Sequence, residues 1–191
     1  GNMDRKMVLK WLQDQLNTPA TKIFHNAMYD VCWIRSATGL MPKGNLYDTM
    51  IAASVIDENR KSYSLDSLSA DYLNDKKYKY DLKDRALAEH GIADPMSNMD
   101  KLPYDLVKDY AEQDVSLTLR LWKKFKEIID KPIQVLGPED NPVKYKTLQN
   151  IFNLETKLFP CLVDIRFKGV RVDKERSEAL GDKLKSKQAN I

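Results

Sequence analysis

The feature that most constrains this chain is a long amphipathic helix, which the sequence predicts from Pro103 to about residue 130. Proline suits the first turn of a helix, and Lys131-Pro132 marks its end. One face of the segment has positions three or four apart, which are apolar or aromatic except for Asp114: Val107, Tyr110, Asp114, Leu117, Leu121, Phe125 and Ile128. Such a seam is typical of a helix that packs one face on a hydrophobic core.

Shorter elements are predicted around this helix, in the order helix, strand, helix, extended segment and further helices. A helix over 4–16 is stopped by Asn17-Thr18-Pro19, and 22–25 is a candidate for a short buried strand. The second helix ends at Gly39, and Asp48 is placed to cap a third over 50–56. Further helices are expected at 64–73, at 148–168 and after 173. Between them, 74–85 is charged and aromatic and 91–99 is loop-like. The Pro and Gly residues of 132–147 indicate a linker.

Composition narrows the functional classes only slightly. Cys32 and Cys161 lie in apolar surroundings and are expected to be reduced. With only two histidines as well, the sequence offers no basis for a zinc site, so a metal would have to be held by carboxylates. A net charge of +3 is too small to demonstrate nucleic-acid binding, and no apolar run is long enough to span a membrane. Trp11, Trp33 and Trp122 fall on apolar helical stripes, which favours the core over a base-stacking surface.

Asp114 is the first candidate site residue, because it occupies a core position on the seam of the long helix. No Lys or Arg lies three or four positions away from it. A buried carboxylate is costly unless a cation or a basic side chain compensates its charge. Tyr110 lies one helical turn earlier on the same face and can reach the same place. The alternative is an aspartate that turns to solvent at the edge of the seam.

Asn26 and Asp30 form the second candidate group, at the point where the predicted strand passes into a helix. Loops at such strand ends often carry function in parallel or mixed sheets. The alternative is a plain helix cap, which both residue types favour. Taken together, Asp30 and Asp114 suggest ligands for Mg²⁺ or Mn²⁺, which prefer oxygen donors. Two such ions would polarise a phosphodiester and activate water for in-line hydrolysis.

The two candidate segments resemble motifs of a known enzyme family. Residues 24–30 (FHNAMYD) resemble motif II, N-x-x-x-D, of the DEDD 3′–5′ exonucleases, and 110–114 (YAEQD) resemble the tyrosine form of motif III. The stretches 47–50 and 64–69 look like the connecting helices of the proofreading domain of family A DNA polymerases. Downstream, 154–160 and 169–173 look like the start of the polymerase domain. The resemblance covers roughly 20–185 and indicates a piece of a DNA polymerase I-like protein, with a phage as one candidate source.

The resemblance implies an α/β, ribonuclease-H-like exonuclease fold that is helix-rich and N-terminally incomplete. The family's motif I, D-x-E on the first strand, has no counterpart before Asn26; the one D-x-E, Asp173-Lys174-Glu175, belongs to the polymerase-start pattern. The opening Gly1-Asn2-Met3 is typical of a tag remnant, and the last helix stops midway. We therefore expect a partial exonuclease domain at 1–131, a linker at 132–147 and the start of a polymerase domain at 148–191.

The resemblance also assigns roles. Asp30 would hold the second metal, Asp114 the metal that binds the attacking water, and the Tyr110 hydroxyl would orient that water. Asn26 would contact the 3′-terminal nucleotide of DNA, and His25 beside it is interpreted as structural. The intact protein would use two Mg²⁺ or Mn²⁺ ions, whereas this piece alone, with half the carboxylates, need not bind any and would be inactive or nearly so. Asp48, Asp57 and Asp66 are interpreted as caps or surface residues.

Two alternative functions fit the same sequence features. The first is a proofreading domain that has lost activity and only supports the polymerase or binds DNA. The second is a stand-alone exonuclease of the ribonuclease D kind, which shares both motifs. This alternative does not explain why residues 154–173 look like the start of a polymerase domain. The protein would act in a bacterial or phage-infected cytoplasm, with no membrane partner. An exposed edge beside strand 22–25 would favour self-association.

Overall fold

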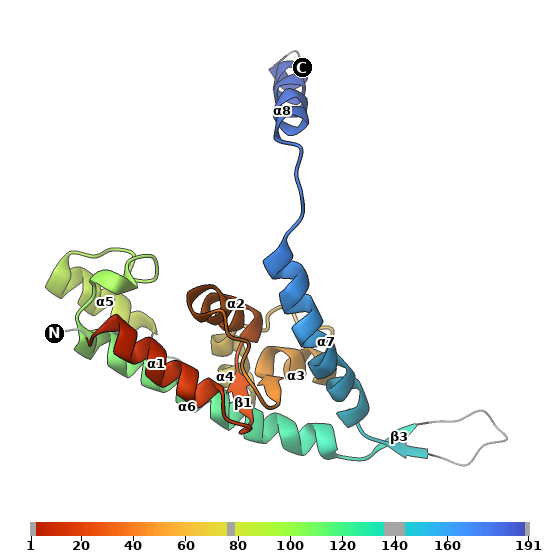
Figure 1. Cartoon of the computed structure of the whole chain (residues 1–191). Helices are drawn as coiled ribbons and strands as arrows, with labels where there is room; N and C mark the ends of the chain where they lie inside the picture. Colours follow the sequence, from red (N-terminus) through yellow and green to blue (C-terminus); the bar gives the residue numbers. More distant parts are fainter. Residues whose placement is uncertain (1–2, 76–78, 136–143, 190–191) are drawn as a thin grey trace.

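A computed structural model describes residues 3–75, 79–135 and 144–189 of the chain. The predicted long helix is confirmed as α6 (Tyr104–Asp130), which follows Pro103 directly. Figure 1 shows α6 running beneath most of the other elements. Helices α3 (Thr49–Ile56), α4 (Leu65–Leu73) and α5 (Lys79–His90) all pack on it. Its buried residues are Leu106, Leu117, Thr118, Leu121, Trp122, Phe125 and Ile129.

The sheet is small and parallel, with β1 (Lys22–Phe24) beside β2 (Leu46–Asp48). The register sets Phe24 opposite Asp48, so the carboxyl ends of both strands lie at the same edge. Helix α2 (Ala27–Thr38) connects them, and α6 packs against β1. The predicted strand is thereby confirmed, and the fold is helix-rich with a small parallel sheet.

The main core joins α3, α4 and α6 to the start of α7 (Gln149–Lys168). Tyr47 of β2 forms an aromatic cluster with Trp122 and Phe152, whose ring centroids lie 4.6 and 5.4 Å from its own. A second cluster brings Phe159 and Val163 of α7 against α2 and β2. Helix α7 is thus held to the rest of the molecule by buried aromatic and aliphatic contacts.

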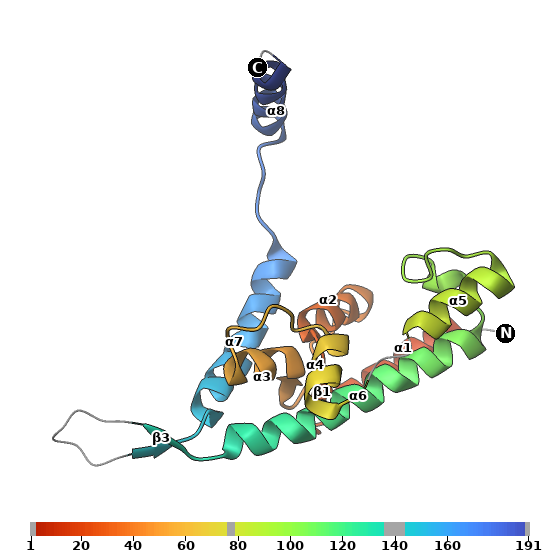
Figure 2. The same ribbon diagram turned by 180° about the vertical axis from the view of Figure 1, so that it is seen from behind.

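Several peripheral elements differ from the sequence expectations. Residues 79–90 form helix α5 within a stretch that had no predicted structure, and Met99–Lys101 form a 3₁₀ turn, η1. Within the expected linker, β3 (Ile133–Val135) and β4 (Lys144–Lys146) pair as an antiparallel hairpin. Helix α8 (Lys174–Ala189) stands away from the other helices on an extended segment, as Figures 1 and 2 show.

Two of the three tryptophan predictions were wrong. Trp122 is buried in the main core, but Trp11 of α1 (Arg5–Leu16) and Trp33 of α2 are each 62% exposed. The apolar stripe of α1 has few packing partners, since Leu16 is the one buried residue of this helix among those described. Periodicity identifies an apolar face but does not supply the surface that covers it.

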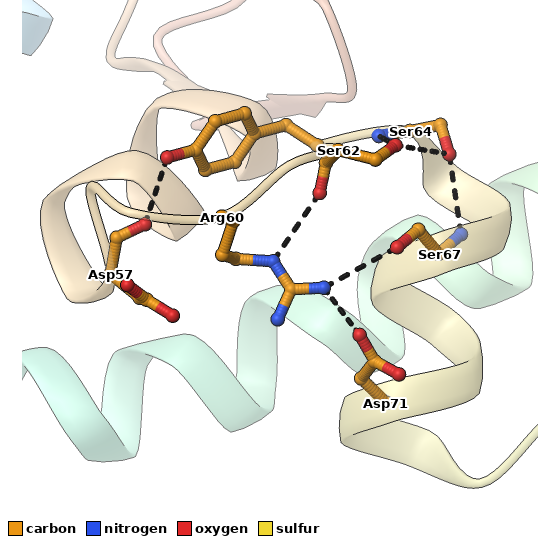
Figure 3. Close-up of polar contacts among 7 residues, drawn as sticks. Asp57, Arg60, Ser62, Ser64, Ser67 and Asp71 are labelled. Atoms are coloured by element: carbon orange, nitrogen blue, oxygen red, sulfur yellow. Dashed lines mark hydrogen bonds and ion pairs between the residues drawn. The ribbon is translucent and has the colours of Figure 1, made fainter.

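The loop between α3 and α4 is closed by Arg60 (Figure 3). Its guanidinium donates to the Ser62 carbonyl (3.3 Å) and the Ser67 hydroxyl (3.4 Å) and pairs with Asp71. The Tyr63 hydroxyl donates to the carbonyl of Asp57 (2.9 Å). Together these bonds fix where α4 begins. In the part of the chain that the structure describes, no helix is long and apolar enough to cross a lipid bilayer.

Candidate active site

A hollow of about 650 Å³ lies where the end of β1 faces α6. Asp30, Tyr110 and Asp114 all line it, together with His25. Three of the four predicted site residues, which come from two distant segments of the chain, are therefore brought to one place. The other lining residues are mostly apolar: Ile23, Phe24, Leu65, Met99, Ala111, Val115, Thr118 and Leu119. Asn26 is exposed and is not among the lining residues.

The turn from β1 into α2 is shaped by Asn26 and Asp48. Asn26 has left-handed backbone angles, φ 62° and ψ 52°, which asparagine tolerates better than most residues. It occupies the N-cap position of α2, but its side chain makes no capping hydrogen bond. The Asp48 carboxylate does this instead, accepting from the backbone N–H of Asn26 at 3.0 Å and of Ala27 at 2.7 Å.

Asp48 also caps its own helix, accepting from the Met50 N–H at 2.8 Å. The prediction of a cap is confirmed, but the alternative of a surface position is wrong, because Asp48 is only 6% exposed. Sequence reasoning missed its contact with the α2 turn. An aspartate between a strand and a helix signals a cap for the following helix, whereas the cross-strand bonds depend on the β1–β2 register.

Asp30 lies in the first turn of α2 and is half-buried. Burial raises the pKa of the Asp30 carboxyl above its usual value, and the negative charge of Asp48 raises it further. Both effects disfavour the carboxylate form. A cation bound in the hollow would reverse this balance, because an opposite charge favours the ionised form.

Helix α6 places Tyr110 and Asp114 one turn apart on the face that lines the hollow. Both side chains are half-buried. Asp57 and Asp66, interpreted as caps or surface residues, do not line the hollow; Asp57 is exposed and Asp66 lies in the first turn of α4. Among the described residues, the carboxylates that line the hollow are the two predicted ones, Asp30 and Asp114.

His25 has a defined tautomer in this arrangement. The Thr49 hydroxyl donates its single hydrogen to the carbonyl of Phe24 (3.1 Å). It must therefore accept from His25 Nδ1, which lies 2.9 Å from it. In the neutral ring the lone pair is then on Nε2. The bond to Thr49 supports the interpretation of His25 as structural, and the ring also lines the hollow.

The donor set fits part of a site for a hard cation. Asp30 and Asp114 offer carboxylate oxygens, which Mg²⁺ and Mn²⁺ prefer. Within 3–75, 79–135 and 144–189, no group of three or more His, Cys, Asp or Glu side chains is placed to hold a metal ion. Further ligands would have to be waters, phosphate oxygens or groups from outside the described residues.

Comparison with known proteins defines the class. A sequence model of the 3′-5′ exonuclease family matches residues 2–130, more than half of the chain, and the chain belongs to this family. Its relatives are DNA polymerases of the family A type. It is 30% identical over 185 residues to DNA polymerase DpoZ of Vibrio phage phiVC8, covering 89% of the chain and 27% of that protein.

Other relatives come from a phage and a bacterium. The chain is 31% identical over 119 residues to the DNA polymerase of Escherichia phage T5, covering 58% of the chain and 14% of that protein. It is 28% identical over 192 residues to DNA polymerase I of Pseudomonas aeruginosa, covering 95% and 19%. The chain thus spans about a quarter or less of the length of these curated relatives.

Proposed function

We propose that this chain is the motif II and motif III part of a proofreading 3′–5′ exonuclease in a longer DNA polymerase. In that protein it would remove 3′-terminal nucleotides from single-stranded or frayed primer ends of DNA. The observation that carries the proposal is the convergence of Asp30, Tyr110 and Asp114 on one hollow. A purely structural domain has no need to place two carboxylates and a phenol on a shared concave surface.

Each residue has a chemical role in this proposal. Asp30 and Asp114 would hold two Mg²⁺ or Mn²⁺ ions, which when bound polarise the phosphodiester and activate water. The Tyr110 hydroxyl would orient the attacking water, because a phenol with a pKa near 10 is a poor base at neutral pH. Asn26, exposed at the rim of the turn, would contact the terminal nucleotide. His25 would hold the end of β1 to α3 through Thr49.

We extend the proposal to the fold of the whole exonuclease domain and to the boundaries of the domains. The β1–α2–β2 unit with α6 behind it would be the second half of a ribonuclease-H-like sheet, whose first strands lie outside this chain. The exonuclease part would extend over 1–131, a linker over 132–147 and the polymerase start over 148–191. The family match ending at residue 130, where α6 also ends, supports the first boundary. The site of action would be the cytoplasm of a bacterial or phage-infected cell.

The first test is activity in a longer chain that carries the family's D-x-E segment. Asp114→Asn or Asp30→Asn should lower Mg²⁺-dependent removal of 3′-labelled nucleotides by at least about a hundredfold, because residues of one metal site act as a unit. Primer extension should be unchanged. Asp109→Asn, an exposed carboxylate on the same helix α6, is the matched control and should leave both activities intact. Equal losses in Asp109→Asn and Asp114→Asn would contradict the proposal.

A second test uses this chain by itself. Mn²⁺ is paramagnetic and broadens the amide resonances of residues near which it binds. Titration should selectively broaden residues 27–31 and 110–115, and Asp114→Asn should reduce the effect whereas Asp109→Asn should not. Broadening spread over the acidic surface, with no difference between the two variants, would mean that the hollow has no preference for a cation.

A further inference from the structure

The ends of the two parallel strands are tied together by two adjacent residues, Asp48 and Thr49. Four contacts run from this pair to the β1–α2 turn. The Asp48 carboxylate accepts from Asn26 N–H and Ala27 N–H (3.0 and 2.7 Å). The Thr49 hydroxyl donates to the Phe24 carbonyl (3.1 Å) and accepts from His25 Nδ1 (2.9 Å). We call Asp48 and Thr49, with these bonds, the strand-end clasp.

Both residues of the clasp are buried. Asp48 is 6% exposed and Thr49 is fully buried. The charge of Asp48 is compensated by three backbone N–H groups at the starts of two helices, because Met50 N–H also donates to it (2.8 Å). The bond from Ala27 N–H is buried and the others are partly buried, so the loss of one of them costs more than the loss of a surface bond.

The clasp acts on the segment that carries the candidate site. The bonds at 24–27 fix every residue between the end of β1 and the first residue of α2. The Asn26 carbonyl then accepts from Tyr29 N–H (3.0 Å), so the first turn of α2 is set by the same geometry. Asp30 lies in that turn and His25 in the turn before it, and both line the hollow.

We propose that Asp48 and Thr49 are positioning residues, which hold the 25–30 segment so that Asp30 and His25 face the hollow opposite Asp114. The proposal rests on the proposed function in so far as Asp30 is a metal ligand. Neither Asp48 nor Thr49 lines the hollow. Their hydrogen bonds therefore act on the site through the backbone of the turn, and the charge of Asp48 acts on it separately by raising the pKa of Asp30.

Substitution of Asp48 can separate this role from ordinary capping. In Asp48→Ser the hydroxyl can still cap α3 through Met50 N–H, because serine is a good N-cap residue. Its shorter side chain cannot also bridge to Asn26 and Ala27. Asp4→Ser is the matched control, since Asp4 caps α1 in the same way, through Lys6 and Met7 N–H, and has no such bridge.

Hydrogen exchange and Mn²⁺ titration of the chain provide the readouts. In Asp48→Ser, exchange of the Asn26 and Ala27 amides should accelerate about tenfold or more, the scale of a lost bond to a charged group. Met50 should change far less, and Mn²⁺ broadening at 27–31 should weaken while that at 110–115 persists. Asp4→Ser should change none of these. Unchanged Asn26 and Ala27 exchange, or accelerated exchange with unchanged Mn²⁺ broadening at 27–31, would overturn the positioning role.

Thr49 offers a second pair of variants if Asp48→Ser fails to fold. Thr49→Val keeps the shape and removes the hydroxyl, whereas Thr49→Ser keeps the hydroxyl. Nitrogen chemical shifts of His25 should show the Nδ1–H tautomer in the unmodified chain and in Thr49→Ser, and lose that preference in Thr49→Val. An unchanged tautomer in Thr49→Val would overturn this half of the clasp. Absence of any Mn²⁺ effect in the unmodified chain would instead contradict the proposed metal function, and the exchange and tautomer data would still decide the clasp.

Discussion

At the scale of single residues, Asp30 has a charge that its surroundings disfavour in the absence of a cation. Its pKa is raised above 3.8 by burial and then by Asp48. A carboxyl with a raised folded-state pKa contributes stability that is fully present below the unfolded pKa and is lost as pH rises through the folded pKa. Without metal, ionised Asp30 therefore lowers the free energy of unfolding at neutral pH.

Asp30→Asn should consequently be neutral or stabilising at pH 7 in EDTA. The gain should be below about 1 kcal/mol, because a half-exposed charge is screened by solvent. Below the unfolded pKa of 3.8 the difference should vanish, since Asp30 is then protonated in both states. Urea unfolding at pH 7 and near pH 3 measures this. A loss of stability at both pH values would contradict this prediction. It would mean that hydrogen bonds of the Asp30 carboxyl stabilise the fold more than its charge destabilises it.

The site residues were predictable from the sequence to different degrees. Asp30, Tyr110 and Asp114 were proposed from their positions at a strand end and on an apolar seam, and the structure places all three on one hollow. Asp48 was predicted as the cap of its own helix or as a surface residue. Its bonds to Asn26 and Ala27 require β1 and β2 to be parallel and in one register, which local residue patterns do not determine.

At the scale of elements, the placement of α4 depends on Arg60. Its side chain is only 14% exposed, and its planar guanidinium reaches three oxygens while lying over the Tyr72 ring at 5.3 Å. Leu65 is the first residue of α4 and also lines the hollow. The bonds of Arg60 therefore affect both the stability of α4 and the wall of the candidate site.

Arg60→Ala should lower the free energy of unfolding by about 1–3 kcal/mol, because charged-group bonds and the packing of the stem are lost together. Arg60→Lys should recover only part of it, since an ammonium lacks the planar fork. Lys10→Ala removes an exposed helical pair, Lys10–Asp14, and is the control, with an expected change below about 0.5 kcal/mol. Urea midpoints of the three variants test this; a loss in Arg60→Ala no larger than in Lys10→Ala would show that the loop does not depend on the guanidinium.

The elements themselves were predicted where their periodicity was strong. Helix α6 was predicted correctly because its seam keeps helical spacing from Val107 to Ile128. Helix α5 was missed because 74–85 has a weak apolar pattern. In the structure Leu82 and Ala86 of this helix are buried against Leu102 and Leu106. The β3–β4 pairing was missed because the Pro and Gly residues of 132–147 indicated a linker.

At the scale of the whole molecule, the open edge of the sheet favours association. Within the described residues β1 pairs with β2 alone, so its second edge has no strand partner there. Such edges tend to pair with other chains. We expect dimers or larger assemblies as the concentration rises from micromolar to millimolar, measured by light scattering. A monomer over the whole range would contradict the prediction.

Helix α7 offers a competing surface for the same association. Its exposed side includes Leu154, Leu158 and Ile165 at helical spacing. Leu158→Lys places a charge on that face without touching β1. If the sheet edge is the contact, the association constant should stay within about threefold of the original, because distant surface sites act independently. A monomeric Leu158→Lys protein would assign the contact to α7 instead.

The last prediction concerns activity of the isolated chain. A two-metal hydrolysis needs enough carboxylates to hold both ions, and among the described residues the hollow presents two, Asp30 and Asp114. The family resemblance places the remaining carboxylates on a D-x-E segment that has no counterpart before Asn26. Because residues of one catalytic unit are far from additive, half of the site should retain much less than half of the activity.

We therefore expect the purified chain to leave 3′-labelled single-stranded DNA intact in Mg²⁺ or Mn²⁺, under conditions in which a longer chain with the D-x-E segment degrades it. Asp114→Asn controls for contaminating nuclease, because residual degradation that it does not change cannot come from this hollow. Degradation by the unmodified chain that Asp114→Asn abolishes would contradict the prediction. It would mean that Asp30, Asp114 and the phosphate oxygens of the substrate suffice to hold the ions. The β1–α2 turn and α6 would then form a catalytic site without the D-x-E segment.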